Sequence, residues 1–129
     1  MKDSDYARLL SFRSDLRRFL RWSEEQARAE GLTPSQHQLL LAIRGHKGAD
    51  GPTIGEIAEY LTLQHHSVVG LVDRAQKAGL VIRSRDAEDH RVVRLQLAPT
   101  GKDVIRRLSA AHMQELRQLR SFALPKSTS

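Results

Sequence analysis

Two successive stretches in the middle of the chain carry apolar residues at intervals of three and four, the spacing that puts them on one face of a helix. The first stretch starts at Thr53, and its apolar positions are Ile54, Ile57, Ala58 and Leu61. The second runs from about Gln64 to Ala78, and its apolar positions are Val68, Leu71, Val72 and Ala75. Thr53 and Glu56 have the spacing of a capping box, and Gly79 suits the left-handed position after a helix. The pattern therefore predicts two short helices, each with one buried face.

A different pattern follows these two helices. Apolar and polar residues alternate from Val93 to Leu97, which predicts a strand with one buried face. The apolar run at 80–82 predicts the strand before it, and the charged segment 83–91 predicts the turn that joins the two. Helix, helix, strand, turn and strand is the order of a winged helix-turn-helix. We therefore expect a mainly α fold with a small β-wing at about residues 80–98.

Two longer amphipathic segments flank this unit. Residues 4–30 carry an apolar stripe that Gly31 stops, and residues 101–123 carry a second stripe that ends shortly before Pro125. Between them, Thr33 and Gln36 form a second capping-box pattern that begins a helix, and the glycine-rich segment 45–52 predicts a flexible joint. Pro99 suits the first position of the last helix, and Thr100 is a candidate for its cap. The tail, residues 126–129, is expected to be disordered.

The two apolar stripes are too large for one small winged unit to cover both. We expect the 129 residues to form a single domain, with 33–100 as the winged core and with 4–30 and 101–123 as dimerisation helices. The predicted interface residues are Leu9, Phe12, Leu16, Leu108, Leu116 and Leu119. A two-fold dimer would place two recognition helices about 34 Å apart, one turn of DNA, and so favour a pseudo-palindromic site.

Short motifs in the same segment strengthen this interpretation. Leu-Thr-Leu stands at 61–63, Leu-Val-Asp-Arg at 71–74 and Gly-Leu-Val at 79–81. The wing carries Asp-x-x-Asp-x-Arg followed by Leu-x-Leu and a glycine, at Asp86, Asp89, Arg91, Leu95, Leu97 and Gly101. In these motifs the chain resembles the MarR (multiple antibiotic resistance regulator) family of bacterial transcription regulators, over nearly its whole length. The resemblance implies a dimeric DNA-binding regulator, a repressor, released from its operator by a small-molecule effector.

The resemblance also implies which residues contact double-stranded DNA. Those at the beginning and on the exposed face of the recognition helix are Gln64, His65, His66, Ser67, Gly70 and Arg74, and those of the wing are Arg83, Arg85, His90 and Arg91. Family members usually have small polar residues and an arginine on that helix face, so the residues found there are departures: Gln64, His65, His66, Val69 and Gly70. His90 replaces the usual Arg or Gly, and Ala98 replaces the threonine that normally caps the last helix.

Each of these assignments has an alternative. The two histidines are side chains that solvent alone could satisfy, and Gly70 either allows close approach to DNA or only weakens the helix. Arg74 either meets a phosphate or pairs on the surface with Asp73 or a neighbouring acid. Arg91 is expected to enter the minor groove from the wing tip, with Asp86 and Asp89 positioning the turn, and an ion pair with either aspartate is the alternative.

A second candidate site lies near the junction of the first two helices. Trp22 and His37 could line the cleft where family members often bind small aromatic or acidic effectors, and simple core packing is the alternative for Trp22. The remaining histidines, His46 and His112 among them, lie on different predicted elements without the spacing of a helical metal site. We therefore expect ordinary polar roles for them, with neither metal nor cofactor.

Composition agrees with a polyanionic partner. Lys and Arg number 21 against 15 Asp and Glu, a net charge of +6. The chain has no cysteine, so it has no disulfide and no thiol sensor, and it carries neither a phosphate-binding glycine loop nor a His-Glu-x-x-His motif, which argues against an enzyme. The polar N-terminus and the lack of a long apolar run predict a cytoplasmic protein without membrane contact. A winged-helix module that binds a protein, with only non-specific affinity for DNA, is the competing hypothesis.

Overall fold

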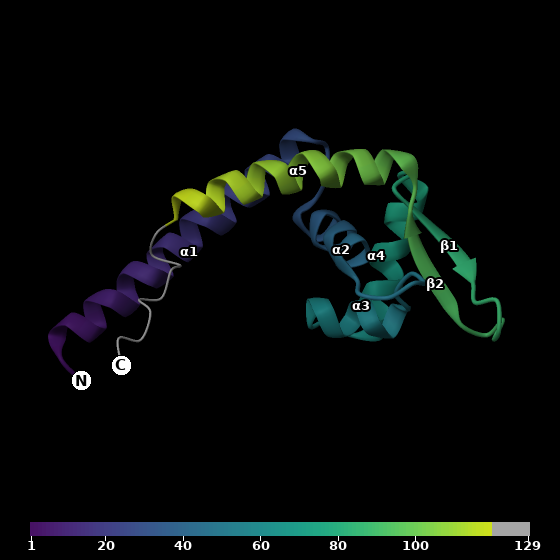
Figure 1. Cartoon of the computed structure of the whole chain (residues 1–129), viewed down its shortest axis with the longest axis horizontal. Coiled ribbons are helices and arrows are strands. Elements are labelled where there is room, and N and C mark those ends of the chain that lie inside the picture. Colours follow the sequence, from purple (N-terminus) through teal and green to yellow (C-terminus); the bar gives the residue numbers. More distant parts are fainter. Residues whose placement is uncertain (120–129) are drawn as a thin grey trace.

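The computed structural model describes residues 1–119. These residues form helices and strands in the order that the sequence predicts (Figure 1). The helices are α1 (Asp3–Ala29), α2 (Pro34–Gly45), α3 (Ile54–Leu61), α4 (His65–Lys77) and α5 (Pro99–Gln118), and the strands are β1 (Val81–Arg85) and β2 (Val93–Leu97). The architecture confirms the predicted winged helix-turn-helix. Residues 120–123 of the predicted last helix and the predicted tail at 126–129 lie outside the described residues.

Local sequence signals set most of the helix boundaries. The hydroxyl oxygens of Thr33 and Thr53 accept hydrogen bonds from the backbone N–H of Gln36, at 3.1 Å, and of Glu56, at 3.2 Å, so both predicted capping boxes form. The cap predicted at Thr100 is wrong. Helix α5 has Pro99 in its first turn and Ala98 at the N-cap without a side-chain hydrogen bond, because proline's fixed φ lets the helix begin two residues earlier than a cap at Thr100 would allow.

The wing is an antiparallel pair in which Val81 lies opposite Leu97 and Arg85 opposite Val93. A third, very short segment joins it, because Thr53 forms a bridge to Arg94 and the N–H of Leu95 donates to the carbonyl oxygen of Pro52 at 2.9 Å. This approach requires Gly51, since a Cβ there would lie 1.9 Å from the carbonyl oxygen of Leu95. The start of α3 is therefore fastened to the inner wing strand.

One apolar core lies beneath α4 and the wing and extends to α2 and α5. Its members include Leu39, Leu40, Ile57, Val68, Val72, Leu95 and Ile105. Leu108 also belongs to this core and is only 3% exposed, so its assignment to the dimer interface is wrong. It lies one turn after Val104 and Ile105 on the inner face of α5, where the apolar stripe of that helix faces its own chain.

The arm formed by α1 and α5 presents apolar side chains outward. Figure 1 shows the two helices side by side, reaching away from the winged unit. Leu9 is 55% exposed and Leu116 is 40% exposed, Phe12 is exposed too, and Leu16 and Leu119 are half-buried. An ion pair between Arg107 and Glu30, at 2.9 Å, links α5 to the end of α1.

Candidate nucleic-acid interface

Helix α4 divides cleanly into two faces. Val68, Leu71, Val72 and Ala75 are buried in the core, whereas His66, Gly70 and Arg74, spaced four residues apart, share the opposite face. Gln64, His65 and His66 are exposed at the helix start, and Ser67 is half-buried there. The side chain of Gln64 makes no capping hydrogen bond, so its amide group is available to a partner at the helix N-terminus.

Gly70 lies beneath the side chain of Arg74. A Cβ placed at Gly70 would sit 3.3 Å from an Nη atom of Arg74, so the guanidinium covers the place where other residues carry a methyl group. The alternative pairing of Arg74 with Asp73 does not occur, because Asp73 pairs with Arg83 from β1 instead. The exposed face of α4 therefore carries no side chain at Gly70 and has the guanidinium of Arg74 beside that position.

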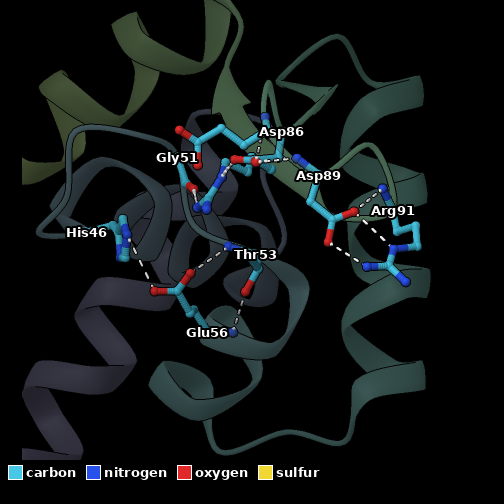
Figure 2. A network of polar contacts seen from close by, with 9 residues as sticks. His46, Gly51, Thr53, Glu56, Asp86, Asp89 and Arg91 are labelled. Carbon is cyan, nitrogen blue, oxygen red and sulfur yellow. Dashed lines mark hydrogen bonds and ion pairs between the residues drawn. The ribbon is translucent and has the colours of Figure 1, made fainter.

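The turn of the wing is organised by Asp86. Its carboxylate accepts hydrogen bonds from the backbone N–H of Glu88 at 3.1 Å and of Asp89 at 3.0 Å, and from Nε of Arg94 at 2.6 Å (Figure 2). These bonds lower the pKa of Asp86, the contact with Arg94 most of all. Asp86 thus remains ionised while it fixes the path of the chain through the wing.

The tip of the wing presents a single arginine. The carboxylate of Asp89 accepts from the backbone N–H of Arg91 at 3.1 Å and from its Nε and Nη at 3.0 and 3.2 Å (Figure 2). This contact lowers the pKa of Asp89. The side chain of Arg91 is nevertheless 91% exposed, so the ion pair orients the guanidinium without covering it. The alternative pairing with Asp86 is absent, because Arg94 occupies that carboxylate.

The other wing arginines are engaged within the chain. Arg83 binds Gln76 and Asp73 and so ties β1 to α4, and Arg85 donates to the carbonyl oxygen of His90 at 2.6 Å. Arg94 donates both to Asp86 and to the carbonyl oxygen of Gly51, the latter at 3.0 Å. The resemblance implied DNA contacts for Arg83 and Arg85. The structure instead makes Arg94 the tether of the wing, a role that no spacing in the sequence could reveal.

The predicted effector residues come together in a cluster of rings. The ring centroids of Trp22 and His37 lie 4.7 and 4.8 Å from that of His112, and Phe19 stacks on Trp22 at 5.9 Å. These residues come from α1, α2 and α5, so the cluster is the joint between the arm and the winged unit. His112 was expected to be an ordinary polar residue, because the rings that it contacts, those of Phe19, Trp22 and His37, lie 75 positions or more away in the sequence.

Two hydrogen bonds hold the ring of His112 in this cluster and indicate which of its nitrogens carries a proton. Nδ1 of His112 faces the carbonyl oxygen of Leu108 at 2.6 Å, so it carries a proton, and Nε2 faces the hydroxyl of Ser23 at 2.6 Å. His37 is 8% exposed, and its burial, followed by the charge of His112, lowers its pKa.

Within residues 1–119 no group of three or more His, Asp or Glu side chains is arranged to hold a metal ion. None of the helices in the same range is long and apolar enough to cross a membrane.

Known proteins are similar to this chain in sequence and in fold. A family model described as MarR family matches residues 30–92. YsmB of Bacillus subtilis, named as an uncharacterized HTH-type transcriptional regulator, is 37% identical over 67 residues, which are 52% of this chain and 46% of that protein. A MarR family protein from Bacillus stearothermophilus superposes with a TM-score of 0.78 at 25% identity, over 100% of this chain and 85% of that one.

A further structural match contains DNA. MepR of S. aureus in complex with DNA superposes with a TM-score of 0.74 at 21% identity, over 89% of this chain and 81% of that one. At that identity the match concerns the fold alone. The chain spans about half the length of the curated relatives it matches.

Proposed function

Because the chain belongs to the MarR family of transcription regulators, we propose that it binds a specific DNA site as a homodimer and so represses transcription. The observation that carries this proposal is the orientation and exposure of the Arg91 side chain. It is aimed by Asp89, on a turn held by Asp86, and its guanidinium is 91% exposed. Such an exposed ion pair adds little to the stability of the protein. It does present an oriented guanidinium, which the negative potential of a narrow minor groove would attract.

The proposed docking uses both exposed elements. The N-terminal half of α4 enters the major groove, where Gln64, His65 and His66 offer donors and acceptors to base edges. Arg91 enters the neighbouring minor groove, and the net charge of +6 favours the approach to phosphates. MepR, of the same fold, has been solved with DNA, which supports this use of the scaffold.

The outer face of the arm is the proposed dimer interface. Leu9, Phe12 and Leu116 would each leave a large apolar surface in water unless a second copy covered them. A two-fold dimer presents two copies of α4 to successive turns of the duplex, so its site is an inverted repeat. A dimer seated on such a site excludes other proteins from it, which is the simplest form of repression.

The competing hypothesis is a protein-binding module that contacts DNA only through its charge. It differs from our proposal in what it predicts for Arg91, since a sequence-blind surface loses the same affinity whichever exposed arginine is removed. Arg106 on α5 provides the matched control, because it is 75% exposed and pairs with Asp103 as Arg91 pairs with Asp89.

The test is selection of bound duplexes from a random pool with three proteins: the wild type, Arg91→Ala and Arg106→Ala. We expect an inverted repeat from the wild type and from Arg106→Ala, and loss of the A·T preference flanking the half-sites from Arg91→Ala. Three pools without any enriched sequence would support the competing hypothesis.

A further inference from the structure

Helix α4 carries an arginine whose guanidinium has no partner in the described part of the chain. Asp73 is the acidic residue of this helix, and Arg83 from β1 occupies its carboxylate at 2.5 Å. Within residues 1–119 no ion pair and no side-chain hydrogen bond includes Arg74, and this side chain is exposed. A guanidinium offers five N–H donors in a fixed planar fork. The donors of Arg74 are therefore available to an acceptor outside the chain.

The side chain of Arg74 reaches back along the helix. The Cα–Cβ bonds of a helix tilt towards its N-terminus, so a long side chain covers the turn before its own residue. Here the covered residue is Gly70, because a Cβ there would lie 3.3 Å from an Nη atom of Arg74. Four residues correspond to about 6 Å along the helix axis. The guanidinium thus lies roughly one turn nearer to the start of α4 than the Cα atom that carries it.

This direction also moves the charge towards the middle of the outward face. At about 100° per residue, Gly70 lies about 30° and Arg74 about 70° from the line opposite the four buried residues of α4. A side chain that pointed straight out from position 74 would aim at the edge of this face, where a helix in the major groove meets the phosphates. Lying over Gly70, the guanidinium instead faces the base edges at the floor of the groove.

Glycine at position 70 leaves this place open. His66 precedes Gly70 by one turn and Arg74 follows it by one turn, so no other side chain of this row occupies the space between them. Gly70 is half-buried although it lies on the outward face, which agrees with a cover provided by Arg74. A larger residue there would put its own side chain between the helix and the base pairs.

We propose that Arg74 binds the O6 and N7 atoms of a guanine in the major groove, and that Gly70 gives its guanidinium the space to do so. Guanine presents two acceptors side by side on this edge, and they match two N–H groups of a guanidinium, whereas adenine presents one acceptor and one donor. The inference rests on the proposed function, since it names a base that the recognition helix reads. It assigns Arg74 to a base and not to the phosphate that the sequence suggested.

The test measures the affinity for the duplex that the wild type enriches and for its single-position variants. Each recurring G·C pair is changed in turn to A·T, and separately its guanine is replaced by 7-deazaguanine, which lacks the N7 acceptor. The proteins are the wild type, Arg74→Ala, Arg74→Met, which keeps most of the side-chain stem, and Lys77→Ala. Lys77 is the matched control, because it is an exposed cation in the last turn of the same helix.

We expect one G·C pair in each half-site to depend on Arg74. At this pair the wild type and Lys77→Ala should lose roughly 5- to 150-fold in affinity when A·T replaces G·C, and should lose affinity with 7-deazaguanine. Both Arg74 variants should bind the original and the changed duplexes equally at this position, and should keep the preferences at the others.

Gly70→Ala tests the second half of the proposal. The added methyl group forces the guanidinium to move, so the preference should fall most at the same base pair, and Gly70→Ala/Arg74→Ala should show no further loss of preference there. A full preference for that pair in Gly70→Ala would overturn the part assigned to Gly70.

The outcomes separate this inference from the proposed function. A wild type that enriches no sequence would overturn the proposed function itself. If an enriched site exists and Arg74→Ala loses the same affinity on every duplex, with a salt slope reduced by about one, Arg74 is a phosphate contact and the inference is wrong while the proposed function stands. Unchanged affinity and preference in Arg74→Ala would overturn the inference as well.

Discussion

Replacing Gly70 by alanine should separate the stability of the protein from its affinity for DNA. Glycine inside a helix is less favourable than alanine by roughly 0.5–1 kcal/mol, because it loses more backbone entropy on folding. The one neighbour that a Cβ would approach closely is the end of the Arg74 side chain, at 3.3 Å, and this exposed side chain can move. Gly70→Ala should therefore raise the unfolding free energy by about 0.5–1 kcal/mol, a rise in Tm of roughly 2–5 °C.

The same methyl group should weaken DNA binding. It would project from the exposed face of α4 into the space where we place the major groove, and forcing one extra methyl group into a packed interface typically costs about 1–3 kcal/mol. That cost corresponds to roughly a 5- to 150-fold loss of affinity. The assays are thermal unfolding followed by circular dichroism, and titration of a labelled duplex followed by fluorescence anisotropy.

Gly55→Ala is the matched control. Gly55 is an exposed glycine inside α3, and a Cβ added there would have the hydroxyl oxygen of Thr53 as its nearest neighbour, at 3.9 Å. Because Gly55 lies in the first turn of α3, where glycine costs less than in the middle of a helix, the control should gain less stability than Gly70→Ala and should bind DNA as the wild type. A Gly70→Ala protein that is more stable and binds DNA as tightly as the control would refute the docking of α4 through Gly70.

Three further outcomes follow from the contacts of single residues. Arg94→Met should displace the wing without unfolding the core, seen as altered amide NMR signals in the wing while Tm stays within a few degrees of the wild type; an unchanged wing would show that Arg94 is not its tether. Leu9→Glu combined with Leu116→Glu should give a folded monomer by sedimentation and remove tight DNA binding, and a monomer that keeps full affinity would contradict the two-fold arrangement. Because the pKa of His37 is lowered from 6.5 in the folded protein, the unfolded chain binds more protons below pH 6.5, so stability should fall as the pH drops from there towards the folded pKa. His37→Gln should flatten this part of a stability curve measured by urea unfolding, and an equally steep curve in the variant would assign the acid sensitivity to other groups.

Local signals in the sequence were sufficient for most of the fold. Thr53 with Glu56 marks the start of α3 because a capping box is a contact between near neighbours, and Asp86 and Asp89 mark the wing turn because they bond to backbone groups two or three residues ahead. Interactions of this range leave a pattern that can be read along the chain.

Contacts between distant segments were the ones that sequence reasoning missed. Arg94 looked like one more exposed cation, yet its partner is a carbonyl oxygen 43 residues away in the loop before α3. The rings of His37 and His112 meet across the joint from separate helices, tilted by 58° to one another, and Leu108 sits on the inner side of a stripe whose outer side faces away from the core. Periodicity identifies the apolar stripe of a helix, but only the packing of α1, α2 and α5 decides which part of the stripe stays exposed.

The central claim is that this chain recognises a DNA sequence and not merely a polyanion. Its most direct test is the titration of an enriched duplex and of a scrambled duplex with the same composition, each at two salt concentrations. We predict an affinity ratio of roughly 10³ or more that persists at the higher salt, because base contacts and the wing contact add to the phosphate term. Equal affinities that fall together with salt would contradict the account, since they would leave only the net charge of +6 as the source of binding.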